Sequence, residues 1–226
     1  MLVTFAPSAP SRAQVGGGIA IESDYRLRGF SYSAGRPTAT ARIGYDDTSG
    51  IYANGSATVL LTGDEDLRFL GVQGNLGIAK RIDPLWAVDG GVIHNEFRPA
   101  YPGARSYDYT EVYLGMTRDP LSARVYFSPN YFRSGVRTLY GELDGSVTPA
   151  KDWRLNAHIG VLTYLSSPEE YSPPNSTYYD WRVGVVRQLG NFEVHASVSD
   201  GGPGQQYYRG SRHSRTAVTF GGSWSY

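Results

Sequence analysis

The sequence predicts an all-β fold: a transmembrane antiparallel β-barrel of about 12 strands, with short periplasmic turns and longer extracellular loops. Three observations predict it. Apolar and polar residues alternate along most of the chain, short and long connections also alternate, and the chain ends in an aromatic strand. In that last strand Val218, Phe220, Trp224 and Tyr226 share one face. Because similar faces recur along the chain, we expect a closed barrel and not a sheet with an exposed edge.

The composition agrees with membrane-crossing strands and excludes other classes. Of 226 residues, 40% are hydrophobic and 13% aromatic, and no stretch approaches the ~20 apolar residues of a membrane helix. The 21 basic and 21 acidic residues give zero formal charge, so we expect no nucleic-acid partner. Because cysteine is absent, the sequence predicts neither a disulfide scaffold nor a thiolate metal site.

The N-terminal residues are expected to lie outside the fold. Residues 1–14 end in small residues as a signal peptide does, but they lack its basic region and full apolar region. We interpret them either as a truncated signal-peptide remnant or as a disordered arm. Residues 15–226 are predicted to form a single outer-membrane β-barrel domain, because neither charge nor composition changes abruptly along them.

Period-two segments, each close to the ~10 residues of a tilted spanning strand, define the predicted elements. They are residues 17–30, 37–46, 51–61, 68–81, 86–97, 107–117, 121–131, 138–147, 153–164, 178–187, 192–200 and 215–226. Compact connections rich in Asp, Gly, Pro and Asn follow every second strand, as tight hairpins require. The other connections are longer, which places all the long connections at one end of the sheet.

Each predicted strand separates an apolar face from a charged face. In the first strand Ile19, Ile21, Tyr25 and Leu27 share the apolar face. The charged faces carry the candidate lumen-lining residues: Glu22, Asp24, Arg26, Arg28, Arg42, Asp89, Glu111, Arg124, Glu142, Asp144, Arg154, Asp180, Arg182 and Glu193. Burying so many charges without partners would cost several kcal/mol each, so this face must be wet or mutually paired.

A soluble barrel would turn the apolar face inward, whereas a membrane barrel turns it outward. The apolar face is mostly Gly, Ala and Val in mid-strand, which packs a soluble core poorly but suits lipid. Only Lys80 and Lys151 among the 21 basic residues are lysines, and arginine is the better partner for carboxylates in a partly desolvated network. The sequence thus predicts a charged lumen, either a narrow pore or a plugged interior.

Aromatic residues are predicted to form two bands at the membrane interfaces. The band beside the short turns comprises Tyr45, Trp86, Trp153, Phe192, Trp224 and Tyr226. The band toward the long connections comprises Tyr25, Tyr107, Tyr131, Tyr164, Tyr179 and Trp181. The alternative is that aromatic residues simply favour strand ends and loops.

Residues 23–31 (SDYRLRGFS) resemble the opening motif S-D-Y-x-x-R-G of the TorF-like porin family of proteobacterial outer-membrane proteins. Residues 109–113 (YTEVY), residues 179–184 (YDWRVG) and the aromatic C-terminus agree with the same family. The sequence departs at residues 33–36, where related sequences commonly carry Asn or Gln. The resemblance implies location and fold more strongly than it implies transport.

Other chemistries have little support in the sequence. His94, His158, His195 and His213 are the only histidines, and His94 has no matching serine motif, so we expect no enzyme and no catalytic residue. The acidic run at residues 63–66 is a conceivable calcium loop but is more typical of a solvated one. We therefore expect neither a metal nor a cofactor.

The predicted function is a porin-like channel for passive diffusion of small polar solutes, in a Gram-negative outer membrane with both termini periplasmic. The alternative is a non-conducting structural or adhesive barrel, and a lipid-modifying enzyme is less favoured. The expected partners are outer-membrane lipid, the barrel-assembly machinery that reads the C-terminal strand, a small polar solute, and a protein of an envelope assembly.

Overall fold

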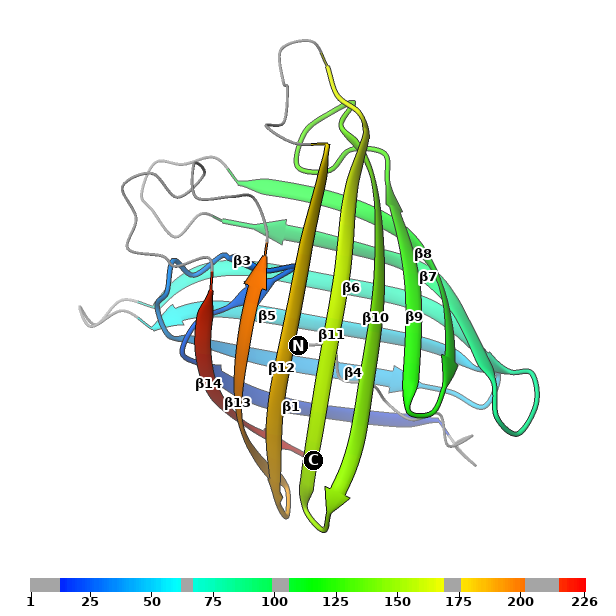
Figure 1. Ribbon diagram of the computed structural model, residues 1–226, viewed down its shortest axis with the longest axis vertical. Helices are drawn as coiled ribbons and strands as arrows, with labels where there is room; N and C mark the ends of the chain where they lie inside the picture. Colours follow the sequence, from blue (N-terminus) through cyan, green and yellow to red (C-terminus); the bar gives the residue numbers. More distant parts are fainter. Residues whose placement is uncertain (1–12, 62–66, 99–105, 169–175, 202–215) are drawn as a thin grey trace.

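The protein, in a computed structural model, is a closed barrel of antiparallel strands, which confirms the predicted fold class (Figure 1). The structure describes residues 13–61, 67–98, 106–168, 176–201 and 216–226. Strand β1 closes the ring because it pairs with β14 on one side and with β4 on the other. Among the described residues, no helix is long and apolar enough to cross a membrane.

Twelve strands form the wall of the barrel. They are β1 (Gln14–Glu22), β4 (Thr38–Asp46), β5 (Ile51–Leu61), β6 (Leu67–Arg81), β7 (Ala87–Phe97), β8 (Tyr107–Arg118), β9 (Leu121–Ser128), β10 (Arg137–Ala150), β11 (Trp153–Ser166), β12 (Thr177–Leu189), β13 (Phe192–Gly201) and β14 (Ala217–Ser225). A separate two-stranded sheet consists of β2 (Arg26–Leu27) and β3 (Phe30–Ser31).

Burial alternates along the strands, and the polar residues are the buried ones. Leu114 is 75% exposed and Ile159 58% exposed, whereas Glu111 is only 2% and Asp180 6% exposed. A soluble protein has the opposite arrangement, with apolar residues inside and charges outside. A continuous apolar exterior of this kind is suited to hydrocarbon and not to water.

Compact turns join the strands at one end of the barrel (Figure 1). In the turn between β4 and β5, the backbone N–H and the hydroxyl of Ser49 both donate to Asp47 Oδ1, at 2.7 and 2.5 Å. These hydrogen bonds lower the pKa of Asp47. Long and short connections alternate with one exception. Connection 62–66, which the sequence predicts to be one of the long ones, has the same number of residues as the short turn 82–86, because β6 spans Leu67–Arg81.

The bounds predicted for the first strand, residues 17–30, are wrong at both ends. Strand β1 begins at Gln14 and ends at Glu22, and the chain then leaves the wall of the barrel. The short strands β2 and β3 are joined by Arg28 and Gly29, whose φ angles of 50° and 73° are both left-handed. Two positive φ values are typical of a type I′ hairpin turn. Residues 24–35 therefore form a hairpin, called the lumen hairpin below.

The lumen hairpin lies inside the barrel, near the end with the long connections. Tyr25 and Leu27, which the sequence placed on the lipid-facing side, instead pack against buried aromatic residues of the interior. The ring of Tyr32 lies 4.4 Å from that of Phe97, centroid to centroid. Local alternation misled the assignment because the arms of a hairpin alternate in the same way as a spanning strand.

The aromatic residues separate into an outer and an inner set. Beside the short turns, Tyr45, Trp153, Phe192, Trp224 and Tyr226 are 37–70% exposed and Trp86 is half-buried. At the other end Tyr107, Tyr179 and Trp181 are exposed, 37%, 67% and 42% respectively. Tyr25, Tyr131 and Tyr164 turn inward, so their predicted place in an outer band is wrong. The interfacial role of the exposed residues stays a prediction.

The lipid-facing side can be tested with two arginine substitutions on one strand. Ile159→Arg puts a charge on the exterior of β11 and is expected to destabilise the barrel in phospholipid vesicles by about 2–4 kcal/mol. Asn156→Arg, on the half-buried opposite face of β11, is expected to cost less because it faces the polar interior. Denaturant unfolding in vesicles measures both, and equal losses would contradict the assignment of faces.

Candidate functional site in the barrel interior

The lumen hairpin is held in shape by its own polar residues. Asp24 Oδ1 accepts hydrogen bonds from the hydroxyls of Ser31 and Ser33, at 2.5 and 2.8 Å. The Arg26 guanidinium donates to Asp24 Oδ2 at 3.1 Å and to the carbonyl of Gly29 at 2.7 Å. These contacts of Asp24 and Arg26 all lie within the hairpin and stabilise its shape.

Arg28, at the tip of the hairpin, fastens it to the wall. Its two terminal nitrogens donate to the two carboxylate oxygens of Glu111 on β8, at 2.9 and 2.7 Å. Its guanidinium carbon also lies 3.9 Å from the centroid of the Tyr140 ring on β10. A planar guanidinium can be bound in its plane by a carboxylate and on its face by an aromatic ring. Strands β8 and β10 are thereby linked through one side chain of the hairpin.

Aromatic residues fill the interior around this anchor. The buried cluster consists of Phe97, Tyr109, Tyr113, Tyr126, Tyr131, Val136, Tyr140 and Leu162. Phe132 lies against it, with ring centroids 4.4 Å from Tyr131 and 4.6 Å from Tyr109, and has a left-handed φ of 58°. Such a backbone conformation is costly for a bulky side chain and requires support from its surroundings. The cluster and hairpin therefore narrow the lumen at this end.

Charged pairs occupy the rest of the interior. Arg124 Nε lies 3.1 Å from Asp89 Oδ2, and Arg154 lies 2.8 Å from Glu193. His195 Nε2 lies 2.8 Å from Glu22 Oε2. The two Arg–carboxylate pairs compensate charges that would otherwise be expensive to hold in a partly desolvated interior, and His195 gives the Glu22 carboxylate a polar partner.

A second group gathers on β10, β11 and β12. The ring nitrogens of His158 lie 2.9 Å from Asp144 Oδ1 and 2.9 Å from Asp180 Oδ1. The Tyr140 hydroxyl lies 3.2 Å from Asp180 Oδ2, and Glu142 Oε1 accepts a hydrogen bond from the Tyr126 hydroxyl at 2.7 Å. This group contains more carboxylates than cations.

Glycines facing the interior let side chains two strands apart meet. In the register, Gly115 of β8 lies between Asp89 and Arg124, and a Cβ there would lie 2.4 Å from Asp89 Oδ1. Gly221 of β14 lies in the same way between His195 and Glu22, and its Cβ would be 2.3 Å from Glu22 Oε2. A methyl group at either position would displace one partner of the pair.

The structure thus gives contacts to most of the candidate lumen residues. Arg42 and Arg182 are half-buried but form no ion pair with a described residue. The sequence did not identify His158, Tyr126 and Tyr140 as partners of the charges, although their positions on the inward parity were visible. The role of all these residues in lining a conducting path stays a prediction.

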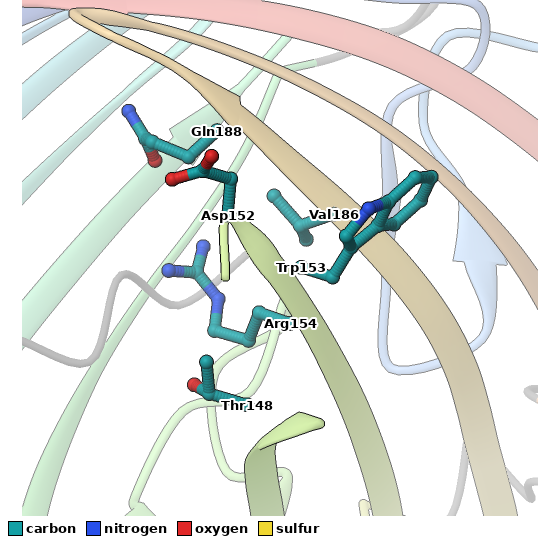
Figure 2. Close-up of a pocket in the computed structure, with 6 residues that line it drawn as sticks. All are labelled: Thr148, Asp152, Trp153, Arg154, Val186 and Gln188. Atoms are coloured by element: carbon teal, nitrogen blue, oxygen red, sulfur yellow. The ribbon is translucent and has the colours of Figure 1, made fainter. Parts of the chain in front are cut away.

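A pocket of about 220 Å³ opens near the short turns (Figure 2). It is lined by Thr148, Asp152, Trp153, Arg154, Val186 and Gln188. Figure 2 shows the guanidinium of Arg154 on one side of β11 and the Trp153 ring on the other. The side chain of Arg154 is 42% exposed, so it is accessible at this end of the interior.

Other sequence candidates give no second site among the described residues. His94 is exposed on the outside of β7, and its Nδ1 lies 2.9 Å from Thr110 Oγ1. No described serine is hydrogen-bonded to it. The acidic run 63–66, His213 and residues 1–12 lie outside the described residues.

The closed barrel with an apolar exterior and a charged interior defines a class: it has the fold of outer-membrane porins. A KdgM porin is similar, with a TM-score of 0.56 at 13% identity over 93% of this chain and 99% of that chain. A NanC porin gives 0.55 at 10% identity over 93% and 99%. A KdgM porin in complex with disordered oligogalacturonate gives 0.54 at 12% identity over 94% and 98%. At these identities the likeness shows the fold alone.

The chain belongs to the Gcw_chp family, bacterial proteins of unknown function, whose family model matches residues 6–219. No curated protein matches the sequence.

The anchor of the hairpin can be tested with a double-mutant cycle. Arg28→Met should cost about 3–5 kcal/mol because it leaves the Glu111 carboxylate buried without its partner. Adding Glu111→Gln should restore part of that loss, since the neutral side chain needs no cation. Unfolding free energies of the wild type, both single variants and the double variant measure the coupling. Strictly additive losses would show that the pair does not anchor the hairpin.

The glycine gaps can be tested with two alanine substitutions. Gly221→Ala should destabilise the barrel by about 1–3 kcal/mol because the new methyl group overlaps the Glu22–His195 pair. Gly74→Ala is the matched control, since nothing lies within 4 Å of its added Cβ. Thermal unfolding in detergent measures both variants. A control as unstable as Gly221→Ala would refute the role of the gap.

Proposed function

We propose that the protein is an outer-membrane channel through which small polar solutes diffuse passively, past a constriction formed by the lumen hairpin. The observation that carries the proposal is the reversed burial, with large aliphatic side chains outside and charged pairs inside. A sheet closed on itself has no free edge, so its backbone is satisfied in hydrocarbon. The charged interior then offers a polar route across the membrane.

The fold shared with KdgM and NanC porins supports the proposal, and so does the resemblance of residues 23–31 to the TorF-like porins. One KdgM porin structure holds oligogalacturonate, an acidic sugar polymer, which supports small polar solutes as the class of cargo. We place both termini on the periplasmic side because short turns in such barrels are periplasmic. The aromatic C-terminal strand, Ala217–Ser225 with Tyr226 after it, is then the signal for the barrel-assembly machinery.

A non-conducting barrel with a structural or adhesive role is the second candidate. The packing of the interior favours it, because Leu60, Leu70, Tyr109 and Val136 are at most 2% exposed around the hairpin. In this alternative the hairpin is a permanent plug that adds stability. The two candidates differ in whether weakening the anchor changes conductance.

Single-channel recording in planar bilayers tests the proposal. The wild type should give small discrete conductance steps, and Glu111→Gln should increase their size or open time because it weakens the attachment of Arg28. Arg154→Gln is the matched control: it also removes one partner of an Arg–carboxylate pair, but near the short turns and away from the hairpin.

Folding of each variant is verified first by heat-modifiable gel migration. If neither the wild type nor Glu111→Gln conducts while both are folded, the protein is the non-conducting barrel. An equal increase in Arg154→Gln would mean that the hairpin is not the constriction.

A further inference from the structure

Three side chains with metal-binding atoms converge inside the barrel. Glu142, Asp144 and His158 each offer one ligand atom, and these atoms all lie within 4.8 Å of one another. The backbone fixes this convergence, because Glu142 and Asp144 share the inward face of β10 and His158 is the register partner of Asp144 on β11. Ligand side chains carried by two adjacent, hydrogen-bonded strands are held more rigidly than ligand side chains on loops.

The surroundings of His158 are those of a metal-bound imidazole. Its Nδ1 faces Asp144 Oδ1, and its Nε2 faces the carboxylate of Asp180, each at 2.9 Å. Without a metal the ring can donate from both nitrogens to the two carboxylates; a bound ion displaces the Nδ1 proton, and donation from Nε2 to Asp180 then leaves the Nδ1 lone pair to ligate beside Glu142 and Asp144. Histidines that bind metals almost always donate their other N–H to a carboxylate or carbonyl in this way.

Glu142 supplies a separate indication. It is 9% exposed, and its Oε1 accepts a hydrogen bond from the Tyr126 hydroxyl at 2.7 Å. Its other oxygen accepts no hydrogen bond from any residue that the structure describes. This oxygen is not among the fully buried atoms that lack a partner, so it is open to the interior and available to bind a cation.

The nearby arginines do not neutralise this group. Arg28 is bound to Glu111 and Arg124 to Asp89, while Arg182, the register partner of His158 on β12, lies within ion-pair distance of no described carboxylate. The carboxylates of Glu142, Asp144 and Asp180 therefore have only His158 as a cationic contact. The local excess of negative charge favours a bound cation.

We propose that Glu142, Asp144 and His158 bind one divalent transition-metal ion of the Zn²⁺ type, and that Asp180 positions His158. Two oxygens and one nitrogen are a ligand set that suits Zn²⁺ and leaves a position for water. Mg²⁺ and Ca²⁺ prefer oxygen ligands throughout and should bind more weakly. The sequence predicted no metal because these three residues, at positions 142, 144 and 158, match no metal-binding motif. The site does not depend on whether the barrel conducts.

Isothermal titration of the folded full-length protein in detergent with Zn²⁺ tests the site. The wild type should bind one ion per chain, and Glu142→Gln, Asp144→Asn or His158→Gln should each weaken binding at least ~10-fold. Glu22→Gln and His195→Gln are matched controls, because Glu22 and His195 form the same kind of contact at 2.8 Å without a third ligand in the described interior. These controls should leave Zn²⁺ binding unchanged.

Cobalt absorption separates ligation from positioning. Saturating Co²⁺ should give visible bands in the wild type that change in His158→Gln, since a ligand is lost. Asp180→Asn should weaken Zn²⁺ binding about 10–100-fold but keep those bands at saturation, since His158 still ligates.

The proposal is overturned if the folded wild type binds no Zn²⁺, or if the Glu22 and His195 controls lose affinity as the site variants do. It is also overturned if Ca²⁺ binds as tightly as Zn²⁺ and His158→Gln has no effect, because the interior would then attract cations by charge alone. Heat-modifiable migration of every variant shows that a loss of binding is not a loss of folding.

Discussion

Charge pairing inside a closed sheet is the constraint on which the rest of the structure depends. Because apolar side chains cover the outside, charged residues in the middle of the strands lie inside, where an unpaired charge is expensive. The barrel resolves this by pairing across strands: Arg124 with Asp89, Arg154 with Glu193, and His195 with Glu22. Gly115 and Gly221 follow from the same constraint, because they give the Arg124–Asp89 and His195–Glu22 pairs room to form.

The lumen hairpin extends the same principle to a segment outside the wall. Its Asp24 and Arg26 satisfy each other and the turn, so the hairpin enters the barrel with its own charges compensated. Arg28 binds a strand of the wall, and Glu111 is the carboxylate that receives it. The rest of the hairpin is held by packing, since Tyr25, Leu27 and Tyr32 lie against the buried aromatic cluster. The hairpin is thus attached both by one ion pair and by apolar contacts.

Much of the fold could be predicted from alternation, because a period of two in a closed sheet fixes which side chains face outward. The charged parity gave the interior positions of Glu111, Arg124 and Asp180 for this reason. The hairpin was missed because Tyr25 and Leu27 alternate with charged residues as a wall strand would, and only Arg28-Gly29 indicates a turn. The partners were missed because contacts across an intervening strand depend on register, which alternation does not determine.

At the tip of the hairpin, backbone strain at Arg28 is set against the contacts that its side chain makes. Its φ of 50° lies where glycine is favoured, and a residue with a Cβ there costs roughly 1 kcal/mol or more. Glycine would relieve that strain but would remove both the Glu111 ion pair and the contact with Tyr140. Removing Arg28 would leave Glu111 buried without its partner, which costs about 3–5 kcal/mol. This loss exceeds the strain, so arginine is favoured over glycine at this position. The strained turn is thus explained by the contacts that the Arg28 side chain makes with Glu111 and Tyr140.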